Sequence, residues 1–211
     1  FLNVLLQEFR DPISVIKTSV DLLRIINTSG SFETTPEILE RMDISIQQLV
    51  DAMENIHLLS DDEIKRSVER EDFDLINACK EIIDEVKAND EYKHNISLIT
   101  YRDTIQCKSD KLIIQAIIRI LLKNSCQYSP LDSTITLEVI LDEYFYNIIV
   151  KDDGVGIPDD ELSMIFEPLY RGTNVRNTTF GTGLGLAIVQ KYSEMLNAEI
   201  YVKIGRATSE L

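Results

Sequence analysis

The chain is poor in cysteine and in basic residues. It has three cysteines in 211 residues, and 21 lysines and arginines against 36 aspartates and glutamates. Because Cys79, Cys107 and Cys126 are an odd and sparse set, they do not indicate a disulfide framework, and we expect buried thiols in a reducing compartment. The formal net charge of −15 repels phosphate backbones and anionic membranes, so nucleic acid is not an expected partner.

The sequence also lacks a long apolar run and a signal peptide. No run reaches the ~18 apolar residues of a membrane span. The chain begins at Phe1 rather than at methionine, in the middle of a repeating pattern. We therefore expect a cytoplasmic fragment of a longer protein, which meets a membrane only through parts that are missing here. At 44% hydrophobic residues, it can bury the core of one domain or of two small ones.

Two segments near the N-terminus have the apolar spacing of packed helices. The first is expected over residues 1–27 and the second from 36 to about 68, with a turn-rich connection at 27–37. A lone hairpin has too little surface to bury both apolar seams, so we expect a second copy and a four-helix bundle. The alternative is that both helices pack onto the rest of the same chain. The seam residues are Leu2, Leu6, Phe9, Ile13, Ile16, Val20 and Leu23, and then Met42, Ile46, Leu49, Met53 and Ile56.

The pattern changes after residue 68, which predicts two domains, 1–68 and 69–211. Strands and helices mix there without regular βαβ alternation, which indicates an α+β sandwich. Ser109 or Asp110 is placed to cap the central helix. A short strand and a helix are expected within 73–88, strands at 95–101 and 104–108, a helix at 109–129, a hairpin at 133–151, a helical start at 160–172, a helix at 184–197 and a last strand at 198–205.

Three short segments of the second domain carry residues suited to a nucleotide. "LLKNSCQYS" places Asn124 near the end of an apolar helix, "VKDDGVGIP" places Asp152 at the end of a strand, and "FGTGLGLAIV" opens a helix with glycines. Glycines before a helix let the backbone approach an anion, and free amides at the helix start favour phosphate. Asp152 can accept a hydrogen bond from an exocyclic amine, and the amide oxygen of Asn124 is a hard ligand suited to Mg²⁺.

Each of these signals is weak alone, but their order and spacing, with "IFEPLYRG" between them, make the joint match specific. The chain resembles the sensor histidine kinases of two-component signalling over nearly its whole length. "LLKNSCQYS" is similar to their N box, "DDGVGIP" to their G1 box, "IFEPLYRG" to their F box and "GTGLGLAIV" to their G2 box.

The resemblance implies a Bergerat-type ATP-binding domain with a mobile lid between Phe166 and Gly181. It also implies that Asp152 reads the adenine amine, that Asn124 holds Mg²⁺ and that the helical hairpin is the dimerisation and phosphoacceptor domain. The positions implied to bind ATP are Asn124, Gln127, Tyr128, Asp152, Gly154, Gly156, Ile157, Phe166, Arg171, Gly181, Thr182, Gly183, Leu184, Gly185 and Leu186.

Two positions of the N box depart from the family pattern. The family usually has a first asparagine where this chain has Ile120, and a basic residue where it has Gln127. Loss of one charge-assisted contact typically costs about 1.5–3 kcal/mol. We therefore expect nucleotide binding that is weakened but not abolished.

The first helix carries "LLQEFRDPI", which resembles the family's phosphoacceptor signature except at the histidine, where Gln7 stands. A carboxamide nitrogen is not nucleophilic, because its lone pair is delocalised into the carbonyl. Glu8 remains where a carboxylate would orient the histidine, and Asp11 stands where phosphatase-competent members often have Thr or Asn. His57 and His94 are expected to be structural or surface residues.

Two interpretations of Gln7 remain open. In the first, the parent is an ATP-dependent protein-histidine kinase that passes phosphate to a response-regulator aspartate, and its phosphoacceptor has been replaced here. In the second, the chain is a natural pseudokinase, a dimeric nucleotide-sensing scaffold. The otherwise intact signature of the first helix favours the first interpretation, and the altered N box favours the second. A different ATPase on the same nucleotide fold is disfavoured by the hairpin.

Overall fold

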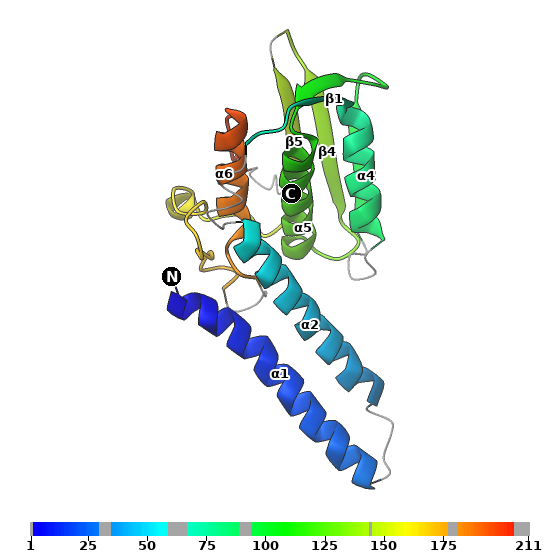
Figure 1. Ribbon diagram of the computed structural model, residues 1–211, viewed down its shortest axis with the longest axis vertical. Helices are drawn as coiled ribbons and strands as arrows, with labels where there is room; N and C mark the ends of the chain where they lie inside the picture. Colours follow the sequence, from blue (N-terminus) through cyan, green and yellow to red (C-terminus); the bar gives the residue numbers. More distant parts are fainter. Residues whose placement is uncertain are drawn as a thin grey trace, which may run out of the picture. The chain divides into compact units, whose positions relative to one another are not determined.

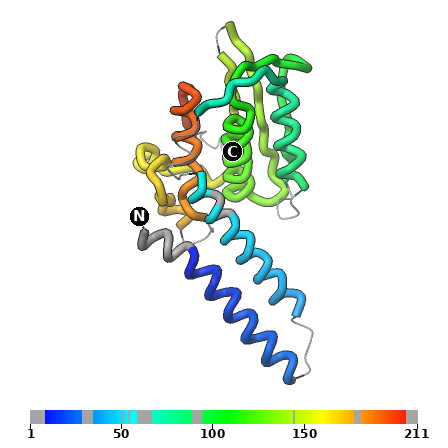
Figure 2. Tube along the Cα trace, viewed as in Figure 1, coloured from blue at the N-terminus to red at the C-terminus, as the bar shows by residue number. Residues whose placement is uncertain are grey.

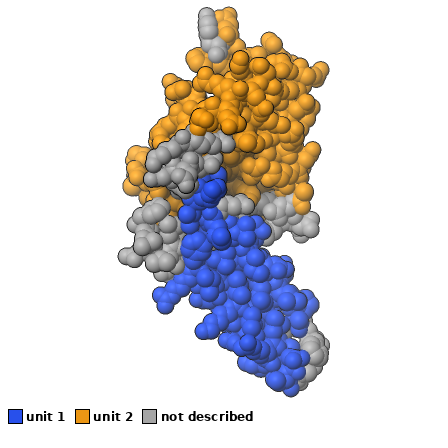
Figure 3. Space-filling model, viewed as in Figure 1, with its two compact units in different colours: residues 1–65 blue, residues 66–211 orange. Residues whose placement is uncertain are grey.

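The computed structural model describes residues 2–29, 35–58, 67–88, 94–143, 145–176 and 181–204; for residues 2–8, 29, 51 and 54 it describes the backbone alone. The chain divides into two compact units, residues 1–65 and 66–211 (Figure 3). The boundary expected from sequence, after residue 68, lies a few residues further along the chain.

The first unit is a hairpin of two helices, α1 (Leu2–Ser29) and α2 (Thr35–Leu58) (Figure 1). The expected extension of the second helix to about residue 68 is wrong at its end, since Ser67 and Val68 are not helical, while residues 59–66 lie outside the described part.

Small side chains, rather than the large ones of the expected seam, are buried in the hairpin. Ser19, Ser45 and Ala52 are at most 4% exposed, whereas the seam residues Ile13 and Met53 are 52% and 63% exposed. The seam prediction was therefore wrong in part, because small residues let two helix backbones approach closely and leave larger neighbours on the flanks. The hairpin thus keeps a broad apolar surface.

The second unit is a mixed layer of strands and helices. A three-stranded sheet has the order β2-β4-β5, with β2 parallel to β4 and β4 antiparallel to β5, and β1 pairs with β3 in a separate antiparallel ribbon. The elements are β1 (Glu71–Asp74), α4 (Leu75–Lys87), β2 (Asn95–Thr100), β3 (Gln106–Ser109), α5 (Lys111–Tyr128), β4 (Thr134–Leu141), β5 (Tyr146–Lys151), a 3₁₀ turn (Asp159–Glu161) and α6 (Gly185–Leu196).

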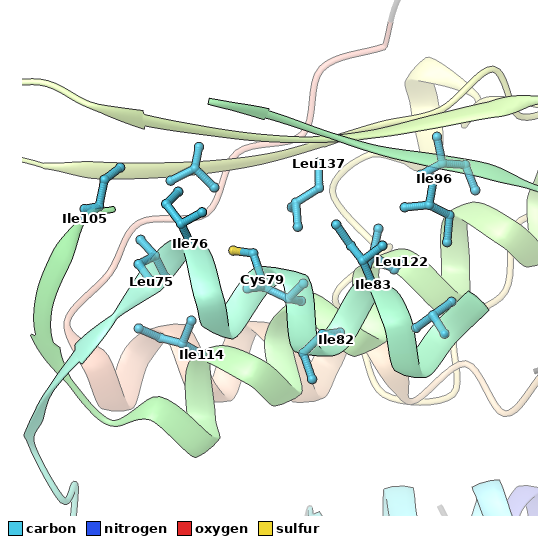
Figure 4. Packing of buried hydrophobic residues seen from close by; sticks show 14 of the residues in the cluster. Leu75, Ile76, Cys79, Ile82, Ile83, Ile96, Ile105, Ile114, Leu122 and Leu137 are labelled. Carbon is cyan, nitrogen blue, oxygen red and sulfur yellow. The ribbon is translucent and has the colours of Figure 1, made fainter. Parts of the chain in front are cut away.

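The core lies between the sheet and α4 and α5 (Figure 4). α5 packs between α4 and α6 and against β4 and β5 (Figures 1 and 2). Ile118 and Leu122 of α5 are fully buried, as are Ile135 and Leu137 of β4. α5 therefore runs through the centre of the domain, so that its C-terminal end has a defined position beside β5 and α6.

Aspartate caps fix the starts of two helices. Asp74 accepts a hydrogen bond from the Ile76 amide (3.0 Å) at the start of α4. Asp110, 1% exposed, caps α5 through the Ile113 amide (3.1 Å) and also accepts from the Glu69 amide (3.0 Å). Of the two capping candidates at this helix, the structure therefore selects Asp110.

One element expected from sequence is shorter than its segment, and another is absent from the described residues. The segment expected to start helical, 160–172, does start with the 3₁₀ helix Asp159–Glu161 and continues in turns. It does not extend into a regular helix, since Pro168 cannot continue one and Leu169 has φ of +68°. Residues 198–204 form no strand, because a strand needs a neighbour for its backbone hydrogen bonds and β5 pairs with β4 alone in the described part.

The three cysteines are free and buried, as expected. None of the described helices is long and apolar enough to cross a membrane.

Candidate functional site

The end of α5, the end of β5 and the start of α6 converge at one place. The Ser125 hydroxyl of α5 donates to the Asp152 carboxylate, which directly follows β5 (Oγ–Oδ2 2.8 Å). A Cβ built on Gly185, at the start of α6, would lie 3.6 Å from both terminal atoms of Asn124. The structure therefore brings together Asn124, Asp152 and Gly185, the key residues of the three sequence motifs.

Asp152 is held in a fixed orientation with part of its carboxylate still accessible. Its second oxygen accepts from the Gly154 amide (2.9 Å), while the residue remains exposed. The Val155 amide donates to the Tyr128 carbonyl (3.1 Å), which closes the turn on α5. Since a carboxylate has about four acceptor positions, Asp152 can accept a further hydrogen bond from a ligand.

Gly154 is required by this close approach. A Cβ at this position would lie 2.8 Å from Asp152 Oδ1 and 2.9 Å from the Tyr128 carbonyl oxygen, shorter than any normal contact. The next glycine, Gly156, has φ of +68°, and its carbonyl accepts from the Asn174 side chain (3.0 Å). Ile157, which follows it, is half-buried.

The glycine turn before α6 packs against the segment around Tyr170. Gly183 has φ of +65°, and a Cβ there would lie 2.6 Å from the Tyr170 carbonyl oxygen. Its own carbonyl accepts from the Leu169 amide (2.9 Å), and the Thr182 hydroxyl accepts from the Leu184 amide (3.2 Å). Only glycine fits a turn that is both left-handed and this close to other backbone.

The start of α6 offers amides to an anion. Leu184, the residue before the helix, is fully buried and makes no side-chain capping hydrogen bond. The first amides of a helix have no intrahelical partner, and the helix dipole adds positive potential there. Gly185 and half-buried Leu186 begin this turn, so it can bind phosphate without a cluster of basic residues.

The guanidinium-bearing residue Arg171 lies close to the glycine turn before α6. The hydroxyl of Tyr128 is near Gly181, where a Cβ would lie 3.5 Å from it. Burial raises the pKa of Tyr128, and the charge and hydrogen bond of the Arg171 guanidinium partly oppose this rise. Arg171 is thus placed between α5 and the glycine turn, and its Nη2 also donates to the Val175 carbonyl (3.3 Å).

Ile120 and Gln127, the two departures from the family pattern, both lie beside the glycine turn before α6. The Ile120 methyl Cγ2 would be 3.1 Å from a Cβ on Gly185, and the Gln127 amide nitrogen 3.2 Å from one on Gly181. An apolar group and a neutral amide therefore border the glycine turn, where the family usually has an asparagine and a cation.

The structure describes part of the expected lid and part of the helix expected to carry the phosphoacceptor position. Phe166 is half-buried, and residues 177–180 of the expected lid lie outside the described part, so lid mobility stays a prediction. Gln7 and Glu8 lie in α1, but their side chains are not described, and Asp11 is exposed on the same helix.

The described residues contain no group of three or more His, Cys, Asp or Glu side chains arranged to hold a metal ion. The amide oxygen of Asn124 remains a hard ligand that could complete a Mg²⁺ shell with phosphate oxygens and water, since Mg²⁺ usually keeps several such ligands. The residues present therefore fit a metal that arrives with a nucleotide.

Ser125 and Glu161 are functional candidates that the sequence analysis missed. Ser125 is 5% exposed and orients Asp152, and Glu161 is 4% exposed and binds Thr173. Neither stands out in the sequence, because each acts on a partner 27 or 12 residues away. Apolar neighbours of Ser125 in α5 were the one available signal that its hydroxyl needed a partner.

Comparison with known proteins defines the class of this domain. The family model described as "Histidine kinase-, DNA gyrase B-, and HSP90-like ATPase" matches residues 109–210. The sensor histidine kinase AtsR of Burkholderia thailandensis is 30% identical over 211 residues, which cover 96% of this chain and 34% of that protein. The sensor histidine kinase YkoH of Bacillus subtilis is 26% identical over 197 residues, 93% of this chain and 42% of that protein.

Solved structures share the fold of both units. The histidine kinase AdeS of Acinetobacter baumannii has a TM-score of 0.63 at 20% identity, covering 89% of this chain and 86% of that one. The histidine kinase ThkA, solved in complex with the response regulator TrrA, has a TM-score of 0.64 at 18% identity, covering 91% of this chain and 53% of that one.

The second unit is therefore a histidine kinase catalytic domain of the ATPase class, joined to a helical hairpin. Over nearly its whole length the chain is similar to sensor histidine kinases. It spans about a third of the length of the curated relatives AtsR and YvrG.

Proposed function

We propose that the chain is the catalytic core of a sensor histidine kinase and binds ATP together with Mg²⁺. The observation that carries this proposal is the Asp152 carboxylate, held by Ser125 and Gly154 beside the uncapped start of α6. Asp152 would accept the adenine amine, the α6 amides and Arg171 would bind phosphate, and Asn124 would hold Mg²⁺. When bound, Mg²⁺ would offset phosphate charge that an acidic chain otherwise repels.

Calorimetry with Asp152→Asn tests the nucleotide site. The amide replaces one acceptor oxygen by a donor, so we expect ATP affinity to fall at least about tenfold. Asp153→Asn removes the same charge from the exposed neighbouring residue and should leave affinity nearly unchanged. Equal affinity of Asp152→Asn and the unchanged chain would refute the assignment of the adenine pocket.

We propose that this chain lacks a phosphoacceptor, because glutamine stands at position 7. The parent kinase would transfer phosphate from ATP to a histidine at this position and then to an aspartate of a response regulator. Gln7→His should therefore restore a phosphoryl label that is labile in acid and stable in base, whereas the unchanged chain should not label. The matched control is Gln47→His on α2, an exposed position outside the phosphoacceptor signature, which should remain unlabelled.

The pseudokinase is the second candidate function. Ile120 and Gln127 favour it, because both remove polarity next to the glycine turn. A Gln7→His variant that binds ATP but takes no label would support the pseudokinase and contradict the kinase proposal.

We further propose that two chains associate through the hairpin and that the assembly meets the receiver domain of a response regulator. The exposed apolar side chains of α1 and α2 support the first part. ThkA, which shares the fold, was solved with a response regulator, which supports the second. Co-sedimentation of the Gln7→His variant with a receiver domain would test the second part, and no association at micromolar concentrations would contradict it.

A further inference from the structure

Glu161 is a buried carboxylate outside the residues assigned to ATP. It ends the 3₁₀ turn after Pro158 and is 4% exposed. A carboxylate is rarely buried to this extent unless it is paired or hydrogen-bonded. The hydrogen-bond partners of Glu161 therefore indicate its role.

Among the described residues, the hydrogen-bond donors to this carboxylate come from one short loop, residues 170–174, and the charge of Arg176 also acts on it. The carboxylate accepts from the Thr173 amide (3.1 Å to Oε2 and 3.3 Å to Oε1) and from the Thr173 hydroxyl (2.5 Å). The Tyr170 hydroxyl is a further partner, and these hydrogen bonds lower the pKa of Glu161, the Thr173 hydroxyl most strongly. The carboxylate is thus an anionic anchor for both ends of this loop.

Gly172 lets the loop wrap around the carboxylate. A Cβ at this position would lie 3.1 Å from Glu161 Oε2 and 2.8 Å from Asn174 Oδ1. Asn174 in turn donates to the Gly156 carbonyl (3.0 Å), which lies in the turn after Asp152. The loop is therefore joined at Thr173 to the Glu161 carboxylate and at Asn174 to the backbone of the turn after Asp152.

The anchored loop carries Arg171 and contacts the glycine turn. A Cβ on Gly183 would lie 3.1 Å from Arg171 Cγ and 2.6 Å from the Tyr170 carbonyl oxygen. Arg171 is flanked directly by Tyr170, which hydrogen-bonds to Glu161, and by Gly172, where a Cβ would lie against the Glu161 carboxylate. A displacement at Glu161 would therefore move a cation that lies beside the glycine turn before α6.

We propose that Glu161 is a positioning residue that holds Arg171 against the glycine turn and so sets the affinity for the phosphates of a nucleotide rather than for its nucleoside. This inference rests on the proposed ATP site. It assigns Glu161 no contact with the ligand.

The first experiment measures, in the absence of nucleotide, how strongly Glu161 holds the loop in place. Glu161→Gln keeps the shape and removes the charge, and Glu167→Gln makes the same change at an exposed residue six positions on. Hydrogen exchange should become faster in the peptide that covers residues 169–176 of Glu161→Gln by about tenfold or more, and stay unchanged in Glu167→Gln. Unchanged exchange in Glu161→Gln would overturn the inference at its first step.

The second experiment compares ATP, ADP and adenosine by calorimetry on the same chains. In Glu161→Gln, Arg171 is no longer held against the glycine turn, so the affinity for ATP and ADP should fall about tenfold. The affinity for adenosine should stay unchanged. Thr173→Val should lower the affinity for ATP and ADP in the same way but to a smaller extent, and Thr173→Ser, which keeps the hydroxyl, should bind them as the unchanged chain does. These two variants test the inference even if Glu161→Gln does not fold.

The outcomes separate this inference from the proposed function. Equal losses for adenosine and ATP in Glu161→Gln would show a general structural role and overturn the inference, while the ATP site would stand. Failure of the unchanged chain to bind ATP or adenosine would refute the proposed function, and the link from Glu161 to phosphate affinity with it.

Discussion

The two units of the chain bury their apolar residues to very different extents. In the second unit, Ile118, Leu122, Ile135 and Leu137 are fully buried in one continuous core (Figure 4). In the described part of the hairpin, Ile38 is the one large apolar side chain that is buried. Large apolar side chains that are exposed there are Ile13, Leu22, Ile25, Leu39, Ile44, Ile46, Val50 and Met53.

From this difference we expect that one unit is complete within a single chain and that the other needs a partner. A layer of helices on a sheet closes its own core, whereas two helices can bury only one stripe of each other. The catalytic domain should therefore be stable independently of protein concentration, and the hairpin should depend on a partner.

The largest expected effect is a truncation in the core of the second unit. Ile118→Ala should lower the free energy of unfolding of that unit by about 3–4 kcal/mol, because the fully buried side chain leaves a cavity. Tyrosine fluorescence in denaturant reports this unit selectively, since all eight tyrosines lie between residues 92 and 201. Leu112→Ala, 63% exposed on the same helix, should change little; equal costs would show that the core is placed wrongly.

A charge on the apolar surface of the hairpin should separate the proposed dimer. Ile46→Glu would place a carboxylate from each copy in the interface, so we expect the dimer dissociation constant to rise about a hundredfold or more. Sedimentation equilibrium measures this constant. Glu40→Gln, a charge change of the same size at an exposed polar position of α2, should preserve the dimer, and an unchanged chain that is monomeric at tens of micromolar would contradict the comparison.

Removal of the buried cap should destabilise the second unit to an intermediate extent. Asp110→Ala deprives the amides of Ile113 and Glu69 of their acceptor, which should cost about 2 kcal/mol. Thermal and denaturant unfolding followed by tyrosine signal would measure the loss. Ser109→Ala tests the rejected capping candidate and should cost less than about 0.5 kcal/mol; a reversed order would contradict the capping assignment.

The smallest expected effect is the ion pair between Glu85 of α4 and Arg119 of α5. Two hydrogen bonds of 2.6 and 2.7 Å join them at the surface. The hydrogen bond from Arg119 lowers the pKa of Glu85 below its ordinary 4.5, against the opposing effect of partial burial. With both side chains partly exposed, Arg119→Gln should cost about 0.5 kcal/mol at pH 7.

The pH dependence of that effect has a definite sign. Because the folded-state pKa of Glu85 is lowered, its contribution is fully present above pH 4.5 and is lost as the pH falls through the folded-state value. The difference between Arg119→Gln and the unchanged chain should therefore shrink below pH 4.5 in denaturant unfolding. A difference that grows on acidification would contradict this assignment.

Much of the catalytic domain could be predicted from local pattern. The apolar period of α5 placed Asn124 near its end, and the strand before "DDG" placed Asp152 at the end of that strand, since both signals lie within one element. The failures lie where a neighbour decides the outcome. The alternating pattern of residues 198–204 is that of a strand, but a strand forms only when another strand pairs with it.

The candidate site shows the same division. Gly154 and Gly183 could be expected from sequence, because backbone turns leave a local mark. Ser125 and Glu161 could not, because their partners Asp152 and Thr173 are brought to them only by the packing of α5 on β5 and by the loop after the 3₁₀ turn.

The sequence by itself determined most of the order of helices and strands, the positions of the glycine turns and the presence of glutamine at position 7. These properties depend on residue type and on neighbours within a few positions. The tertiary structure alone decided that small side chains fill the hairpin contact, that Ser125 orients Asp152 and that Glu161 anchors the Arg171 loop. Burial and hydrogen bonding between distant segments depend on which surfaces meet in space, and that information is not local in the chain.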